Sequence, residues 1–358
     1  MFVMVTLRCD ILVVGAGPAG SSAARAAAGR GLEVLVVERR DTVGVPVQCA
    51  EYIPAPLLAE VGLGRGFVVQ SVKEMRTVQP DGAVKAMRAP GFMIRRDLFD
   101  QSLASAAERQ GVRLLASTRV LGVEGGKVVI QRRGESREKR VLAKVIVGAD
   151  GPRSTVGRWI GSENRNLIPA VQWRVSLSRS MEHTEVYFHE DFYGGYGWLF
   201  PVGREANVGL GRKRRSAHDE RIGKVLERFV SRLAEEGKIE RKPLRATAGW
   251  IPAEPVRRVT RDNVLLVGDA AGHTHPVTGA GVSQAVIGGR MAGRWAARAA
   301  ETGDLSLLGA YEEEWSEWFG EVQERANKRR KSLEKNWDRL ASAVRTSWVA
   351  FREYYADK

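Results

Sequence analysis

The chain of 358 residues contains only two cysteines, Cys9 and Cys49. Two cysteines exclude a disulfide framework, a zinc site with four thiolate ligands and an iron–sulfur cluster held by four thiolates. The sequence also lacks an uninterrupted apolar run of about 18 residues, so it predicts no membrane-spanning helix. It has no repeat of about 20–50 residues. We therefore expect a cytoplasmic globular protein whose apolar N-terminus is a first strand and not a signal peptide.

Basic residues and glycines, by contrast, are in excess. The chain has 56 Lys and Arg against 42 Asp and Glu, which gives a formal net charge of +14. This charge favours an anionic partner such as nucleic acid, a membrane surface, or a phosphorylated cofactor or substrate, or it serves solubility alone. The 39 glycines cluster instead of recurring every third residue. Such clusters indicate loops where the backbone approaches another group closely.

The first glycine cluster lies between two apolar segments. Residues 9–14 and 33–37 predict buried strands, and residues 15–20 read G-x-G-x-x-G. In a strand–turn–helix unit these glycines let the backbone approach a pyrophosphate, whose charge the helix N-terminus stabilises. A carboxylate at position 38, where the second strand ends, favours FAD or NAD over NADP through the adenosine ribose. The predicted binding residues here are Gly15, Gly17, Pro18, Ala19, Gly20, Glu38 and Arg39.

Two further turns follow apolar strands. Residues 147–151 read VGADG and residues 267–272 read VGDAAG. The order of the three motifs resembles the flavoprotein monooxygenase-like superfamily, whose FAD domain is assembled from separated segments. The resemblance implies that Asp269 binds the ribityl chain, that the helix after residues 279–282 points at the flavin pyrimidine, and that the Arg of an R-x-x-F-D stretch lies along the cofactor. It adds the cofactor-binding residues Arg96, Asp150, Gly268, Asp269, Gly279, Gly281 and Val282.

Two shorter segments narrow the resemblance. Residues 196–201 read YGWLFP ahead of GLG at 209–211, and residues 46–51 read PVQCAE. These segments resemble signatures of the geranylgeranyl reductase family, which saturates isoprenoid double bonds with reduced FAD and includes archaeal enzymes for glycerophospholipids. The resemblance implies FAD as the cofactor and a polyprenyl lipid as the substrate. It implies a pocket lined by Tyr196, Trp198, Phe200 and Pro201.

The source of electrons lies outside the predicted fold. No second G-x-G-x-x-G follows a strand, so the chain lacks a separate pyridine-nucleotide domain. The flavin is then reduced by an external donor, which the sequence leaves open between NAD(P)H, a ferredoxin and another reductant.

Cys49 is the candidate catalytic residue. Its loop matches the family segment that places a cysteine near the flavin ring, so Cys49 and Ala50 are implied as flavin neighbours and Cys49 as a proton source. The alternative is a small buried hydrophobe, which we expect for Cys9. His273 and His275 form an H-x-H pair without a third ligand cluster, so no metal site is predicted.

The predicted fold class is α/β, with a Rossmann-like FAD-binding domain built on a parallel sheet, an antiparallel-sheet substrate domain and a C-terminal helical segment. The domains interleave in the sequence. The FAD-binding domain takes residues 1–66, 91–165 and 256–301, the substrate domain residues 67–90 and 166–255, and the C-terminal helices residues 302–358.

Alternatives remain open at three points. An FAD-dependent aromatic monooxygenase shares the three flavin motifs and is the second candidate function. The basic runs at 212–215 and 328–331 suggest nucleic acid, but no nucleic-acid-binding module accompanies them. The tryptophans of the basic C-terminal segment either seat it on an anionic membrane or pack onto the domain. They are Trp315, Trp318, Trp337 and Trp348.

Overall fold

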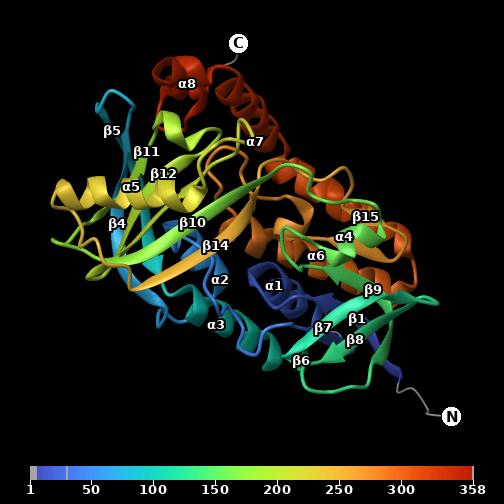
Figure 1. The fold of residues 1–358 in the computed structure, drawn as a ribbon. Helices are drawn as coiled ribbons and strands as arrows, with labels where there is room; N and C mark the ends of the chain where they lie inside the picture. The colour runs from blue at the N-terminus through green and yellow to red at the C-terminus, as the bar shows by residue number, and fades with distance from the viewer. Residues whose placement is uncertain (1–5, 30, 357–358) are drawn as a thin grey trace.

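Two β-sheets and a layer of long helices build the protein (Figure 1). The computed structural model describes residues 6–29 and 31–356. Residues 1–5, which the predicted first domain and first strand include, lie outside the described residues, as do residues 30, 357 and 358.

The first sheet, sheet A, carries the expected parallel core. Its order is β15-β16-β9-β1-β2-β6, and the hairpin β7–β8 joins it through β9. The pairs from β16 to β6 are parallel. Apolar runs form its central strands because both faces are covered. The strands are β1 (Thr6–Val14), β2 (Val34–Val37), β6 (Arg113–Leu115), β7 (Thr118–Glu124), β8 (Lys127–Arg132), β9 (Lys139–Gly148), β15 (Thr260–Arg261) and β16 (Val264–Leu266).

The second sheet, sheet B, is antiparallel except for one pair. Its order is β14-β10-β13-β12-β11-β4-β5-β3. Strands β4 and β11 pair in parallel, because β4 comes from an earlier part of the chain and no hairpin joins the two. The strands are β3 (Tyr52–Pro54), β4 (Val68–Val78), β5 (Val84–Ile94), β10 (Leu167–Ser176), β11 (His183–Tyr187), β12 (Tyr196–Val202), β13 (Glu205–Gly211) and β14 (Arg245–Pro252).

The predicted division at residues 66 and 91 differs from this pairing. Residues 52–54 and 91–93 were expected in the FAD-binding domain, yet they pair with each other at the edge of sheet B. The chain therefore enters sheet B soon after residue 51 and leaves it after residue 94. The domain division itself stays a prediction.

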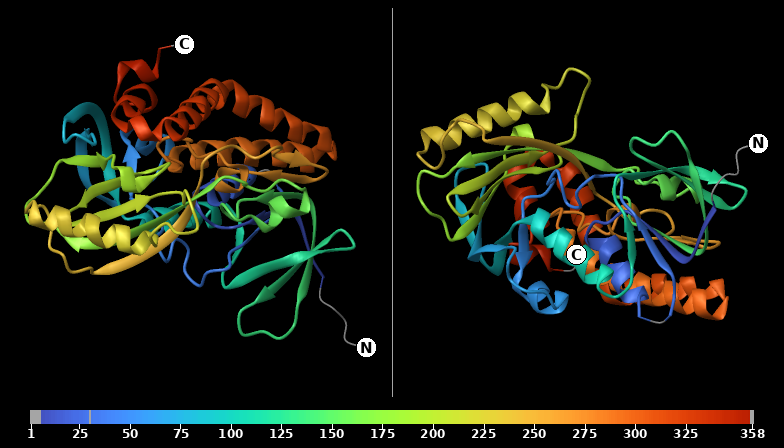
Figure 2. Two further views of the ribbon diagram at one scale, coloured as in Figure 1. Left: turned by 45° about the horizontal axis from the view of Figure 1, so that its top comes forward. Right: turned by 90° about the horizontal axis from the view of Figure 1, so that it is seen from below.

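Helices cover both sheets. Figure 2 shows α6 and α7 together as one layer, and α5 on the outer face of sheet B. The helices are α1 (Pro18–Ala27), α2 (Ala55–Val61), α3 (Arg96–Glu108), α4 (Thr155–Trp159), α5 (Ile222–Glu235), α6 (Val282–Thr302), α7 (Gly309–Lys335) and α8 (Leu340–Ser347). No helix of the described residues is long and apolar enough to cross a membrane.

Small residues let α1 and α6 approach closely. A Cβ atom on Gly289 would lie 2.4 Å from the carbonyl oxygen of Ala19, and one on Gly293 would lie 2.1 Å from that of Ala23. Both distances are shorter than any real Cβ contact, so these two positions require glycine. This contact fixes α6 against α1, the helix of the G-x-G-x-x-G turn.

We expect Gly293→Ala to lower the free energy of unfolding by about 1–3 kcal/mol, because the new methyl group forces the two helices apart. Urea denaturation followed by circular dichroism measures the change. Gly223→Ala in α5 is the matched control: a Cβ there meets no described atom within 4 Å, so its better helix propensity is expected to add up to about 1 kcal/mol. Equal stability of the two variants would contradict the close contact.

The C-terminal tryptophans mostly pack inward. Trp315, Trp337 and Trp348 are buried, whereas Trp318 is 64% exposed. The indole N–H of Trp348 donates to the Thr77 hydroxyl at 2.9 Å, which joins the C-terminal segment to β4. Packing onto the domain, one of the two expected roles, is thus confirmed for three of the four tryptophans.

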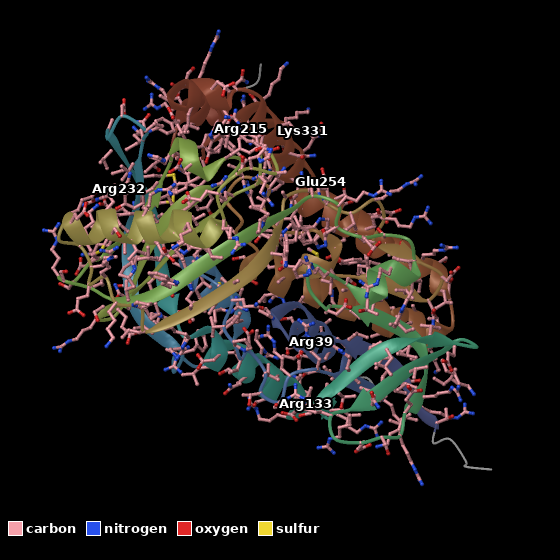
Figure 3. All side chains as sticks on the ribbon, viewed as in Figure 1. Arg39, Arg133, Arg215, Arg232, Glu254 and Lys331 are labelled. Carbon is pink, nitrogen blue, oxygen red and sulfur yellow. The ribbon has the colours of Figure 1, made fainter. Side chains whose placement is uncertain are left out.

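The two basic runs also contribute to the interior. Arg212 pairs with Asp219 at 3.0 Å, and the buried Arg330 pairs with Glu334 at 2.8 Å. Other charged side chains lie at the surface, as the labelled Arg39, Arg133, Arg232 and Lys331 illustrate (Figure 3). Arg212 and Arg330, one residue of each run, therefore take part in the fold through ion pairs.

Candidate active site

The turn between β1 and α1 has the form expected for a phosphate site. A Cβ on Gly15, whose φ is +102°, would lie 2.4 Å from the carbonyl oxygen of Ala149, and one on Gly20 would lie 1.9 Å from that of Gly15. Gly17 is different, because a Cβ there would meet no described atom within 4 Å. Two glycines are therefore required by the fold, whereas the third opens onto free space at the helix N-terminus.

The N-terminus of α1 suits an anion. Gly17 is its N-cap and Pro18 its first residue, and no side chain of the described residues caps it. Its free backbone N–H groups and the helix dipole then face the open space beside Gly17. These features fit the pyrophosphate of FAD, which Gly15, Gly17, Ala19 and Gly20 would hold.

Glu38 lies at the end of β2, buried beside this turn. Its carboxylate accepts the backbone N–H of Ala16 at 2.8 Å and that of Arg40 at 2.9 Å. It thereby ties the phosphate turn to β2. Arg39 is exposed next to it. Binding of the adenosine ribose by Glu38 and Arg39 stays a prediction.

The segment from Gly268 to Val282 follows β16, which β9 separates from β1, and it contacts α1, since a Cβ on Gly268 would lie 2.8 Å from that of Ala19. The carboxylate of Asp269 accepts the hydroxyl of Thr274 at 3.0 Å. Burial raises the pKa of Asp269, although Thr274 and Arg96 oppose the shift. Gly281 is the N-cap of α6, again without a side-chain cap among the described residues. This second free helix N-terminus beside a partly buried carboxylate fits the expected site for the flavin pyrimidine and ribityl chain.

Arg96 connects this segment to the cysteine loop. Its guanidinium forms two hydrogen bonds of 3.0 Å with the carboxylate of Asp100, one turn further along α3. Burial lowers the pKa of Arg96, but Asp100 and Cys49, which is within hydrogen-bonding reach, outweigh burial and raise it. The charge of the Arg96 guanidinium thus acts on two groups that are distant in the sequence, Cys49 and Asp269.

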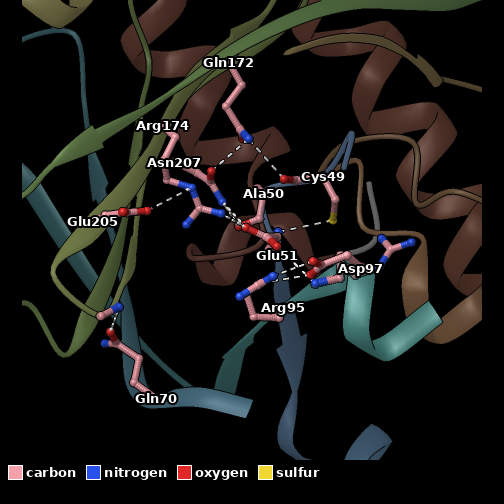
Figure 4. A network of polar contacts seen from close by, with 12 residues as sticks. Cys49, Ala50, Glu51, Gln70, Arg95, Asp97, Gln172, Arg174, Glu205 and Asn207 are labelled. Atoms are coloured by element: carbon pink, nitrogen blue, oxygen red, sulfur yellow. Dashed lines mark hydrogen bonds and ion pairs between the residues drawn. The ribbon is translucent and has the colours of Figure 1, made fainter. Parts of the chain in front are cut away.

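Glu51 lies beside Cys49 in a network that Figure 4 shows from close by. Its carboxylate accepts a guanidinium N–H of Arg174, a side-chain N–H of Asn207 at 3.0 Å and the backbone N–H of Arg96 at 3.1 Å. Only 1% of Glu51 is exposed, and its φ is +70°. A left-handed conformation costs a residue with a side chain about 1–3 kcal/mol and persists only where its surroundings enforce it.

Sheet B presents polar groups to the same loop. Gln172 on β10 donates to the carbonyl oxygen of Cys49 at 3.1 Å and to the side chain of Asn207 at 2.9 Å. The indole N–H of Trp198 on β12 donates to Gln172 at 2.9 Å. Trp198, a predicted pocket residue, is therefore linked to the cysteine loop through one amide.

The other predicted pocket residues lie in different surroundings. Tyr196 donates its hydroxyl to the carbonyl oxygen of Thr278, just before α6, and burial raises its pKa. The ring of Phe200 meets that of Tyr52 edge to face at 6.4 Å. Side chains alternate along a strand, so Pro201 is expected on the face of β12 that carries Leu199, which belongs to the same core cluster as the buried residues of α5. The place of Pro201 in the pocket stays a prediction.

Asp150 is engaged in a local role. Its carboxylate accepts the hydroxyl of Ser154 at 2.5 Å and the backbone N–H of Thr155 at 2.6 Å, where α4 begins. These bonds shape the turn after β9. Contact of Asp150 with the cofactor stays a prediction.

The polar residues around the cysteine loop were not predicted from the sequence. Glu51, Arg174 and Asn207 come from a loop and two strands and meet only in the folded chain. One signal was present: Gln172 and Asn207 interrupt the apolar strands β10 and β13, and both are buried. A buried amide in a strand needs a partner, which marks its position as unusual.

The two histidines of the H-x-H pair point apart. The ring of His273 stacks on Trp315 at 3.5 Å, and that of His275 lies 3.3 Å from the Tyr354 hydroxyl. No group of three or more His, Cys, Asp or Glu residues suited to a metal ion occurs among the described residues. Both histidines therefore pack between the segment from Gly268 to Val282, on which they lie, and the C-terminal part of the chain.

Both histidines should make the protein sensitive to acid. Burial lowers the pKa of His273 to about 3 and that of His275 to about 4. The histidines of the unfolded chain bind protons near pH 6.5, whereas those of the folded chain stay neutral. The free energy of unfolding is therefore highest above pH 6.5 and falls as the pH falls towards 4. At pH 5 each histidine lowers the free energy of unfolding by roughly 2 kcal/mol. Urea denaturation at pH 7 and pH 5 should show a smaller acid loss in His273→Phe than in the wild type, and an equal loss would contradict the assignment.

Known proteins share this arrangement. Residues 8–326 match the family described as FAD binding domain. The chain is 35% identical over 334 residues to a digeranylgeranylglycerophospholipid reductase of Methanothrix thermoacetophila, which covers 88% of this chain and 84% of the relative. A geranylgeranyl bacteriochlorophyll reductase-like protein from Thermoplasma acidophilum superposes with a TM-score of 0.83 at 28% identity, covering 96% and 97% of the two chains.

The monooxygenase alternative has weaker support. A probable FAD-dependent monooxygenase from Pseudomonas aeruginosa superposes with a TM-score of 0.69 at 20% identity, over 94% of this chain and 99% of the other. At that identity the likeness shows the fold alone. The α/β fold with an FAD-binding domain and FAD as the cofactor are thus confirmed, and the chain belongs to the geranylgeranyl reductase family of FAD-dependent oxidoreductases.

Proposed function

We propose that the protein saturates C=C bonds in the geranylgeranyl chains of a glycerophospholipid. The names of the relatives support this substrate class. The observation that carries the proposal is the meeting of two free helix N-termini at the segment from Gly268 to Gly281, where a Cβ on Gly268 would lie 2.8 Å from that of Ala19 and one on Gly281 would lie 3.4 Å from the Asp269 carboxylate. In this proposal Cys49 is the proton donor beside the flavin ring that this segment is expected to hold.

The reaction adds a hydride to one alkene carbon and a proton to the other. Bound reduced FAD supplies the hydride. The thiol of Cys49 supplies the proton, and the Arg96 guanidinium stabilises the thiolate that remains. A proton from solvent restores the thiol. Each saturated bond thus consumes two electrons and two protons, and the electrons come from an external reductant.

A prenyl chain carries no polar group along its length, so its binding site must be apolar. The aromatic rings of Tyr196 and Trp198 lie 6.0 Å apart on β12, and the ring of Trp348 lies 5.1 Å from Tyr196. These rings continue from the cysteine loop towards the C-terminal helices. They are the proposed lining of the prenyl site, together with Phe200.

The electron donor and a membrane contact belong to the same proposal. One dinucleotide turn leaves no second site of that kind for a bound nicotinamide, so NAD(P)H, a ferredoxin or another reductant would dock transiently.

The membrane contact would involve α7. An anionic bilayer would hold the substrate, and Trp318 on α7 is exposed. Flotation with vesicles containing phosphatidylglycerol should then show binding that high salt weakens.

Single-turnover chemistry tests the function. Photoreduced protein is mixed anaerobically with digeranylgeranylglycerophospholipid, and the lipid is analysed by mass spectrometry. We expect a gain of about 2 mass units per saturated bond, from the added hydride and proton. A phenol panel under air is the comparison. An unchanged lipid, together with oxygen insertion into a phenol, would replace the reductase with the monooxygenase.

A further inference from the structure

We propose that Glu51 is a positioning residue whose carboxylate holds its own backbone N–H against the sulfur of Cys49. This inference rests on the proposed role of Cys49 in the reaction. Glu51 has a role separate from that chemistry, since its carboxylate accepts hydrogen bonds from Arg174, Asn207 and the backbone of Arg96.

The first step of the argument is the direction of the N–H group. The backbone nitrogen of Glu51 lies 3.2 Å from Cys49 Sγ, within the range of a hydrogen bond to sulfur. This N–H belongs to the peptide between Ala50 and Glu51, whose carbonyl oxygen accepts the Asn207 amide at 3.0 Å. The φ of +70° at Glu51 sets how the rest of the residue leaves that peptide, so the N–H can stay at the sulfur while the carboxylate reaches its three donors. An alanine at this φ would be strained, and relief of that strain would rotate the peptide relative to β3.

The second step is what enforces that conformation. Three donors from three elements converge on the Glu51 carboxylate: Arg174 on β10, Asn207 on β13 and the backbone N–H at the start of α3. A buried carboxylate with these partners is fixed, because any rotation would leave a buried charge unpaired. The amide of Asn207 also donates to the carbonyl oxygen of Ala50 at 3.0 Å, which holds the intervening residue.

The third step is the effect on the sulfur. The Glu51 N–H donates to Cys49 Sγ. A hydrogen bond with a fixed donor holds its acceptor in one direction. Loss of this donor therefore frees the sulfur to leave the position from which it reaches the substrate.

A pair of variants separates backbone geometry from charge. Glu51→Ala and Glu51→Gly both remove the carboxylate, but glycine adopts a positive φ without strain whereas alanine does not. If Glu51 positions the cysteine through the backbone, Cys49 in Glu51→Gly should keep much of its wild-type reactivity, and Cys49 in Glu51→Ala should lose it. A purely electrostatic role predicts that the two variants behave alike.

The first measurement is the rate of alkylation by iodoacetamide in the FAD-loaded protein, read by peptide mass spectrometry. Burial raises the pKa of Cys9 to about 12, so Cys9 is the unreactive internal control. We expect the rate at Cys49 to fall about tenfold in Glu51→Ala and to stay within about threefold of wild type in Glu51→Gly. Glu205→Gln is the matched control, because the half-exposed Glu205 also pairs with Arg174, at 3.7 Å, and leaves the cysteine loop intact. It should react like the wild type.

Other outcomes would overturn the proposal. They are an unreactive Cys49 in the wild type, equal rates in the alanine and glycine variants, and faster alkylation in Glu51→Ala, which is the sign expected from removing a negative charge alone. If Glu51→Ala does not fold, Glu51→Gln takes its place with the same expected direction. Because alkylation needs no lipid, a protein that fails to reduce geranylgeranyl chains can still confirm or refute the role of Glu51. With substrate, Glu51→Ala should lower kcat and leave KM unchanged.

Discussion

Cys49→Ala is expected to lower the rate of C=C reduction by about 10²–10⁴-fold, the range over which a positioned proton donor contributes to catalysis. The side chain is partly exposed, whereas Cys9 is buried in the core of sheet A. An isolated alkene is a poor hydride acceptor, so its reduction depends on proton delivery to the second carbon. Removal of the thiol takes away that proton without removing Arg96 or the residues expected to bind the cofactor.

The measurement is the rate at which lipid oxidises the photoreduced flavin in a single turnover. The flavin absorbance is followed over time under anaerobic conditions. Flavin content and the rate of photoreduction should match the wild type, because Cys49 lies beside the expected ring position and makes no contact with the phosphate turn. Cys9→Ala is the control for loss of a thiol, and we expect it to turn over normally. Full turnover and normal flavin reduction in Cys49→Ala would remove the catalytic role and leave Cys49 as a small packing residue.

The sequence predicted the parts of this site that depend on local geometry. Glycines at fixed spacing after an apolar strand specify a turn, and the structure contains the turns at Gly15–Gly20 and at Gly268–Gly272. The R-x-x-F-D stretch forms the first turn of α3, and the place of Arg96 along the cofactor stays a prediction. In each case a few neighbouring residues decide the conformation, so the pattern is visible without knowledge of the fold.

The remaining part depends on pairing between distant segments. Glu51 meets Arg174 and Asn207 only because β10 and β13 are neighbours in sheet B. Strand register decides which side chains face the cysteine loop, and a shift of one residue would turn each of them to the opposite face. The same reason bears on Pro201, which the motif assigns to the pocket but which strand alternation assigns to the face of Leu199. A motif specifies the types of residue at a site, whereas strand register specifies the directions in which their side chains point.

Gly17→Ala is expected to weaken FAD binding about 100-fold while leaving the fold intact, a difference of about 2.7 kcal/mol in binding free energy. Gly17 has φ −69° and ψ −176°, an extended conformation that any residue adopts and that suits a residue before proline. A Cβ there meets no described atom within 4 Å, whereas one on Gly20 would lie 1.9 Å from the carbonyl oxygen of Gly15. The protein therefore has no internal need for glycine at position 17. The need comes from a ligand whose pyrophosphate approaches the backbone.

Titration of FAD into flavin-free protein, followed by flavin fluorescence, measures the affinity. Thermal unfolding of the flavin-free variants separates binding from stability: Gly17→Ala should melt like the wild type, and Gly20→Ala should melt well below it because its methyl group has no room. Gly223→Ala in α5 should change neither affinity nor folding cooperativity. If Gly17→Ala binds FAD as tightly as the wild type, the space beside Gly17 does not hold the pyrophosphate, and the cofactor must approach α1 from another direction.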